Sequence, residues 1–173
     1  MKILLLSILL IGTIYCVESY NYSGIKEVRT SVKSKVKYSL GHYRSSELSK
    51  EELKEFLLNH SVKTVIRLNG EKGDSDGLSI VDERKIGRLY GVKFIYLPMT
   101  TPYDKWAKKV ISQMNETTLV HCHHGYDRTG FIFAYLGMTK YGYTFNQVRK
   151  MNGWDKWDKY SKVFYPTLKG LKK

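Results

Sequence analysis

Residues 120–131, VHCHHGYDRTGF, concentrate side chains that can do chemistry. The stretch holds one of only two cysteines in the chain, together with three histidines and an Asp-Arg pair. The other cysteine, Cys16, lies in an N-terminal apolar run that resembles a removable leader. Without Cys16, Cys122 has no partner for an internal disulfide, so its thiol is either buried and inert or reactive.

The neighbours of Cys122 favour a reactive thiol. Cys122 follows a short apolar strand, and Arg128 stands where an apolar helix begins, with the loop HHGYD between them. Gly125 can adopt the positive φ that turns backbone N–H groups inward, and such a loop opening onto a helix N-terminus binds anions. The positive end of a helix also lowers the pKa of a nearby cysteine and makes the thiolate available.

Two further side chains suit a tetrahedral anion held beside the sulfur. The planar guanidinium of Arg128 can bind two oxygens of such an anion at once, a geometry that lysine cannot match. Thr129 can donate a hydrogen bond to the sulfur and steady it as a leaving group. Together these residues predict transfer of a phosphoryl group to Cys122.

Alternating strands and helices must position this loop. Strands are expected at 35–45, 62–68, 92–98 and 117–121, and helices are expected to begin after Ser49, Ser79 and Thr144, with others across 104–115 and 130–138. Trp154, Trp157 and Tyr160 are expected to cover the edge of the core. This order predicts an α/β fold with a mostly parallel sheet of about 4–5 strands flanked by helices, and ligands bind beyond the carboxyl ends of such strands.

The loop resembles H-C-x-x-G-x-x-R-T-G, the signature of the cysteine-dependent protein tyrosine and dual-specificity phosphatase superfamily. The stretches YRSSELSKEELKEFLLNHSVKTVIRLNGE and YLPM are similar to small exported bacterial dual-specificity-like phosphatases, so that the likeness covers roughly residues 36–160. The resemblance implies the tyrosine phosphatase fold and a phosphocysteine intermediate at Cys122 that water hydrolyses. It implies neither a metal nor another cofactor.

The resemblance also implies a general acid that protonates the leaving oxygen. Its usual place is a loop after the preceding strand, here MTTPYDKW, which makes Asp104 one candidate. Asp127 inside the loop is the other, because some lipid-directed relatives carry the same DRTG. Substrate contacts are expected from His123, His124, Gly125, Tyr126 and Gly130.

Several functions remain open at this point. A protein tyrosine or dual-specificity phosphatase is the first interpretation, and a phosphoinositide or inositol-phosphate phosphatase is the main alternative. An RNA 5′-triphosphatase and an inactive phosphate-binding module are further alternatives. A zinc site at His121–His124 is disfavoured, because four contiguous residues cannot converge on one tetrahedral ion.

Charge and the N-terminus bear on partners and localisation. Lys and Arg number 29 against 16 Asp and Glu, a formal charge of +13, which attracts phosphorylated proteins, other phosphomonoesters or anionic lipid. Nucleic acid is disfavoured by the leader, and a monomer is expected. Residues 1–19 are expected to be a signal peptide or N-terminal anchor, 20–35 a basic lead-in and 36–173 one domain, exported to the periplasm or beyond or held at the membrane.

Overall fold

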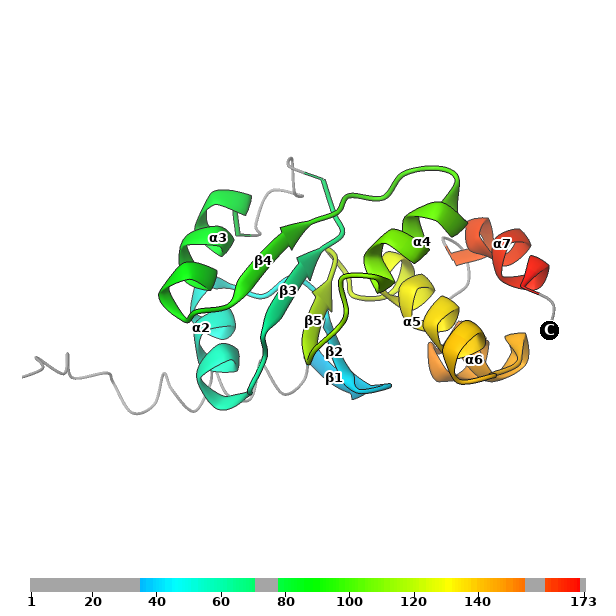
Figure 1. Cartoon of the computed structure of the whole chain (residues 1–173), viewed down its shortest axis with the longest axis horizontal. Helices are drawn as coiled ribbons and strands as arrows, with labels where there is room; N and C mark the ends of the chain where they lie inside the picture. The colour runs from blue at the N-terminus through cyan, green and yellow to red at the C-terminus, as the bar shows by residue number, and fades with distance from the viewer. Residues whose placement is uncertain (1–34, 71–77, 155–160, 172–173) are drawn as a thin grey trace, which may run out of the picture.

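The computed structural model describes residues 35–70, 78–154 and 161–171. The expected signal peptide, nearly all of the basic lead-in, and Trp157 and Tyr160 lie outside these residues. Within them the chain forms a central sheet with helices on both faces (Figure 1). None of the described helices is long and apolar enough to cross a membrane.

The sheet has five strands in the order β1-β2-β5-β3-β4. Their bounds are Val36–Ser39 (β1), His42–Ser45 (β2), Thr64–Arg67 (β3), Lys93–Tyr96 (β4) and Thr118–His121 (β5). The β2-β5, β5-β3 and β3-β4 pairs are parallel, and only β1 and β2 are antiparallel. The predicted α/β fold with a mostly parallel sheet is therefore confirmed.

One predicted strand is in fact two. The segment 35–45 forms a hairpin, in which Leu40 and Gly41 both have positive φ, 52° and 80°. A two-residue turn with two positive φ values matches the twist of antiparallel strands. Gly41 adopts this conformation without cost, but leucine rarely does. The turn at Leu40 and Gly41 could therefore not be predicted from the sequence.

The helices divide between the two faces of the sheet (Figure 1). Helices α2 (Lys50–Asn59) and α3 (Ile80–Leu89) cover one face, where they pack against Val65 and Leu119. The other face carries α4 (Tyr103–Ile111), α5 (Asp127–Lys140), α6 (Phe145–Met151), the 3-10 turn η1 (Ser161–Phe164) and α7 (Tyr165–Gly170). The neighbouring strand residues Ile66 and Val120 point to this second face, as the alternation of side chains in a strand requires.

Local capping signals set the helix starts. Ser49 and Glu52 form a complete capping box at α2, and Thr144 with Gln147 forms another at α6, as the sequence predicts. Ser79 caps α3 by accepting a hydrogen bond from the backbone of Asp82. Helix α5 differs, because Tyr126 precedes it and no side chain caps it. Its first N–H groups are thus left available beside the loop that follows β5.

Candidate active site

The loop that joins β5 to α5 carries the nucleophile predicted from the sequence. Cys122 directly follows β5, and Arg128 is the second residue of α5. β5 lies between β2 and β3, which pair with His121 through Ser45 and Arg67. The loop therefore sits at the carboxyl end of the central strand, where ligands of parallel sheets bind.

Gly125 is required in this loop for two reasons. Its φ is +67°, as predicted, and a Cβ added to it would lie 2.3 Å from the backbone nitrogen of Ser46 and 2.4 Å from the carbonyl carbon of Ser45. Any other residue would meet both the strain of a left-handed backbone and a collision with the end of β2. The loop thus packs directly on the segment after β2.

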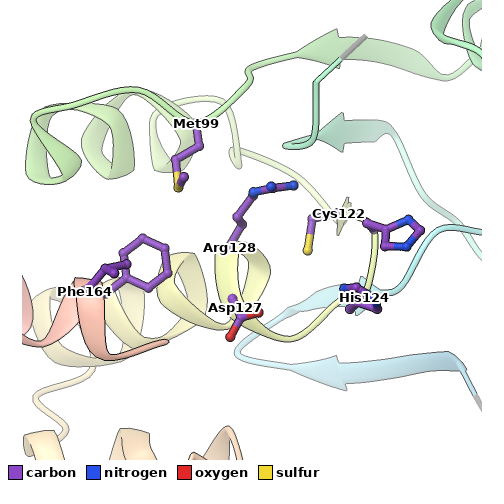
Figure 2. Close-up of a pocket in the computed structure, with 8 residues that line it drawn as sticks. Met99, Cys122, His124, Asp127, Arg128 and Phe164 are labelled. Atoms are coloured by element: carbon purple, nitrogen blue, oxygen red, sulfur yellow. The ribbon is translucent and has the colours of Figure 1, made fainter. Parts of the chain in front are cut away.

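A cavity of about 300 Å³ opens above the loop. Figure 2 shows the side chains of Cys122, Arg128 and Asp127 around it, at the uncapped start of α5. Cys122 is 3% exposed, whereas Arg128 and Asp127 are half-buried. The complete lining is Met99, Cys122, His123, His124, Asp127, Arg128, Val163 and Phe164.

The remaining predicted residues take different places. His123 and His124 line the cavity, with their rings edge to face at 4.2 Å. Gly125 and Tyr126 line a neighbouring cavity instead, and Gly130 packs against Trp154.

Thr129 is fully buried, and its hydroxyl has no hydrogen-bond partner. Its predicted hydrogen bond to the Cys122 sulfur is therefore not formed in this structure, although the residue stands at the start of α5 as expected.

The two candidate general acids, Asp127 and Asp104, differ in their position relative to the cavity. Asp127 lines the cavity, where burial raises the pKa of its carboxyl group and the charges of His124 and Arg128 oppose that rise. Asp104 lies in the first turn of α4, where its carboxylate is 3.7 Å from the ammonium group of Lys108. Asp104 is not part of the cavity lining, so the geometry favours Asp127 as the acid.

A buried ionic network supports the loop on the side facing α2 and α3. Arg67 is fully buried at the end of β3, and its guanidinium lies 3.0 Å from Glu47 Oε1 and 2.7 Å from Glu83 Oε1. The other oxygens of these carboxylates face two histidines beside Cys122: Glu47 Oε2 is 3.2 Å from Nδ1 of His123 in the loop, and Glu83 Oε2 is 3.4 Å from Nε2 of His121 at the end of β5. A buried charge needs buried partners, and Arg67 has two carboxylates within 3.0 Å.

Sequence reasoning missed this network. Its partners are 20 and 16 positions from Arg67, and no local pattern joins them. The available signal was an arginine inside the apolar run VKTVIRL, because a charge on a buried strand requires a buried partner.

A second buried arginine holds the loop from the other side. Arg44 is 7% exposed; one of its N–H groups donates to the Gly125 carbonyl at 3.0 Å, and another donates to the side-chain oxygen of Asn152. Its guanidinium also stands 5.4 Å from the ring centre of Phe133 on α5. The loop is therefore fixed to both β2 and the end of α6.

The wall of the cavity opposite the loop is apolar. Met99 follows β4, while Val163 and Phe164 belong to η1. The Phe164 ring stacks on that of Phe131 with centroids 4.4 Å apart, which fixes this wall to α5. An apolar wall facing a cationic, anion-binding loop suits a substrate with a phosphate at one end and an apolar body.

The histidines around Cys122 point to different partners, as the contacts of His121 and His123 with Glu83 and Glu47 show. Among the described residues, no three His, Cys, Asp or Glu side chains are grouped so that they could hold a metal ion.

Comparisons with known proteins agree with this geometry. The model of the tyrosine phosphatase family matches residues 82–142, which contain the whole loop. No curated protein matches the sequence. The fold is shared with solved phosphatases at low sequence identity, so these likenesses concern the fold.

Three of these structures illustrate the likeness. The catalytic domain of the PP-IP phosphatase SIW14 from S. cerevisiae has a TM-score of 0.60 at 16% identity, covering 75% of this chain and 82% of that one. A putative phosphatase from Neisseria meningitidis has a TM-score of 0.60 at 16% identity, with 79% and 97% covered. A variant of TpbA from P. aeruginosa in complex with phosphotyrosine has a TM-score of 0.56 at 20% identity, with 70% and 73% covered.

Proposed function

This chain is a cysteine-dependent phosphatase of the tyrosine phosphatase type, and we propose that it hydrolyses phosphotyrosine and related aryl and alkyl phosphomonoesters. The observation that carries the proposal is that one cavity holds Cys122, Arg128 and Asp127 at the uncapped start of α5. Its apolar wall of Met99 and Phe164 would contact an aromatic ring beyond the phosphate. The TpbA variant bound to phosphotyrosine supports this choice of substrate.

The first step forms a bond between sulfur and phosphorus. The Cys122 thiolate attacks the phosphorus atom, and the bond from phosphorus to the leaving oxygen breaks. Arg128 and backbone N–H groups at the start of α5 bind the phosphoryl oxygens, so that the charge that develops on them is stabilised. Asp127 donates its proton to the leaving oxygen, which departs as an alcohol or phenol.

The second step returns the enzyme to its starting state. The Asp127 carboxylate accepts a proton from a water molecule, and that water attacks the phosphorus of the phosphocysteine. The bond from phosphorus to sulfur breaks, and Cys122 regains its electron pair as a thiolate. Inorganic phosphate leaves, and Asp127 is protonated again for the next cycle.

A substrate panel tests the proposal. Hydrolysis of phosphotyrosine peptide, phosphoserine peptide, phosphoinositides, inositol polyphosphates and triphosphate-ended RNA is measured with the parent chain and with Cys122→Ser. We expect turnover of phosphotyrosine peptide that is abolished in the variant, because only the nucleophile is removed. Equal turnover by the parent and the variant would exclude the phosphocysteine.

Arg128→Lys provides a second test that keeps the charge. Because lysine cannot bind two phosphoryl oxygens in one plane, we expect kcat/KM to fall by about 100-fold, which corresponds to the loss of one or two charge-assisted hydrogen bonds. A value of kcat/KM near that of the parent would assign Arg128 a purely structural role.

We also propose that the chain is exported. The apolar run after Lys2 in the sequence supports this proposal. Cell fractionation with mass measurement of the recovered protein tests it. A protein recovered at full length from the soluble cytoplasm would contradict export.

A further inference from the structure

A second cavity, of about 250 Å³, lies beside the catalytic one. It is bounded by the hairpin β1-β2, the catalytic loop and the end of α6. Its lining consists of Lys35, Lys37, Arg44, Ser45, Ser46, His124, Gly125, Tyr126, Met151 and Asn152. His124 lines both cavities, so that they are adjacent.

Three of the lining residues are cationic. Lys37 on β1 and Arg44 on β2 are direct cross-strand partners in the hairpin. Like charges directly opposite each other on neighbouring strands destabilise a sheet, and here one of the two is almost completely buried. Burial lowers the pKa of Arg44 to about 10, although the nearby Cys122 and Tyr126 oppose this shift.

Protein groups compensate only part of this charge. The ammonium group of Lys35 lies 2.7 Å from a carboxylate oxygen of Glu52. Arg44 instead donates to two neutral oxygens, those of Gly125 and Asn152. Among the described residues, no carboxylate pairs with Lys37 or Arg44.

Cationic side chains without carboxylate partners favour an anion as the occupant of this cavity.

We propose that this second cavity binds another phosphate group of the same substrate molecule while the first phosphate is held at Cys122. The inference rests on the proposed function and adds to its substrates molecules that carry a second phosphate group. Lys37 supplies the main unpaired charge, and Arg44 completes the site. The shared His124 places both phosphates on one compact ligand.

Binding to a chain that cannot turn over tests the proposal. Calorimetry measures the affinity of Cys122→Ser for inositol hexakisphosphate, a compact ring that offers phosphate pairs at several spacings. We expect the further change Lys37→Gln to weaken this affinity about tenfold, the loss of one charge-assisted contact. The matched control is Lys93→Gln, which removes an exposed strand lysine at the opposite edge of the sheet and should change the affinity less than twofold.

The outcomes are distinct. Equal weakening by Lys37→Gln and Lys93→Gln would mean that only net charge matters and would overturn the site, as would no weakening by either. A parallel titration with inorganic phosphate tests whether the cavity binds free phosphate. If the chain binds two phosphate ions, and Lys37→Gln leaves the affinity for inositol hexakisphosphate unchanged, the cavity is not a substrate site and the proposal is overturned. Turnover of para-nitrophenyl phosphate by the parent chain is measured separately, so that its absence would count against the proposed function alone.

Discussion

Glu47 contacts His123 twice, once through the backbone and once through the side chain. Its backbone N–H donates to the His123 carbonyl at 2.9 Å, and its Oε2 lies 3.2 Å from His123 Nδ1. The same carboxylate pairs with buried Arg67. Glu47 therefore connects the residue after the nucleophile to the centre of the sheet.

Glu47→Gln should reduce both stability and activity. It leaves Arg67 with one carboxylate in place of two, so the free energy of unfolding should fall by about 3 kcal/mol, the lower end for breaking a buried ion pair. The value of kcat/KM should fall about tenfold, because the loop loses an anchor. Urea unfolding and steady-state kinetics measure the two effects. Glu116→Gln, at an exposed position, is the control, and equal behaviour of the two variants would contradict the role of Glu47.

Gly125→Ala and Gly91→Ala form a matched pair. Both glycines have positive φ, +67° and +65°, but a Cβ at Gly91 meets no atom within 4 Å. Gly91→Ala should therefore lose only the 1–2 kcal/mol, approximately, that a left-handed backbone costs, with activity unchanged. Gly125→Ala should lose more stability and at least tenfold in kcat/KM, because the loop must move away from Ser45. Similar losses in both variants would show that backbone strain alone matters.

The choice between the two acids can be made by leaving-group dependence. Asp127→Asn should lower kcat by roughly 10²–10⁴ with phosphotyrosine and by much less with an activated aryl phosphate, which needs no proton on its leaving group. Asp104→Asn should be mild with both substrates, since Asp104 pairs with Lys108 and does not line the cavity. The reverse pattern would assign the acid to Asp104, and losses independent of the leaving group would make both residues structural.

The raised pKa of Asp127 predicts a pH dependence of stability. The folded chain keeps this proton at pH values where the unfolded chain, with a pKa near the ordinary 3.8, has lost it. Stability therefore falls as pH rises from the unfolded pKa through the raised folded pKa. Because Asp127→Asn lacks this titration, the free energy of unfolding of the variant relative to the parent should rise across that window. Urea unfolding from pH 3 to pH 7 measures it, and a difference that does not vary with pH would show that burial leaves this pKa unshifted.

The features predicted from the sequence are those encoded by neighbouring residues. The two capping boxes, at Ser49 and Thr144, and the order of strand, loop and helix around Cys122 depend on contacts within a few positions. The hairpin at Leu40 was not predicted, because a leucine rarely adopts positive φ. Asp104 was a candidate because of its position in the chain, but it does not line the cavity. Which side of a helix faces a cavity depends on long-range packing, which local sequence patterns do not encode.

The support of the site was beyond the sequence for the same reason. Arg67, Glu47 and Glu83 meet only after β2, β3 and α3 have assembled. Likewise Phe164 reaches the cavity from a segment more than thirty residues after Arg128. Long-range contacts of this kind can be identified only from the folded structure, whereas the reactive cysteine and its loop can be identified from the sequence motif at residues 120–131.

The near-complete burial of α5 has a consequence for the kinetics of folding. Residues Thr129–Gly137 of this helix are buried, and β5 on the other side of Cys122 is buried along its whole length. The catalytic loop therefore lies between two buried segments, and neither can open without exposing part of the core. Recovery of enzymatic activity after dilution from denaturant should therefore coincide with protection of the α5 amides from hydrogen exchange. The time at which activity returns then reports when the core of the domain forms.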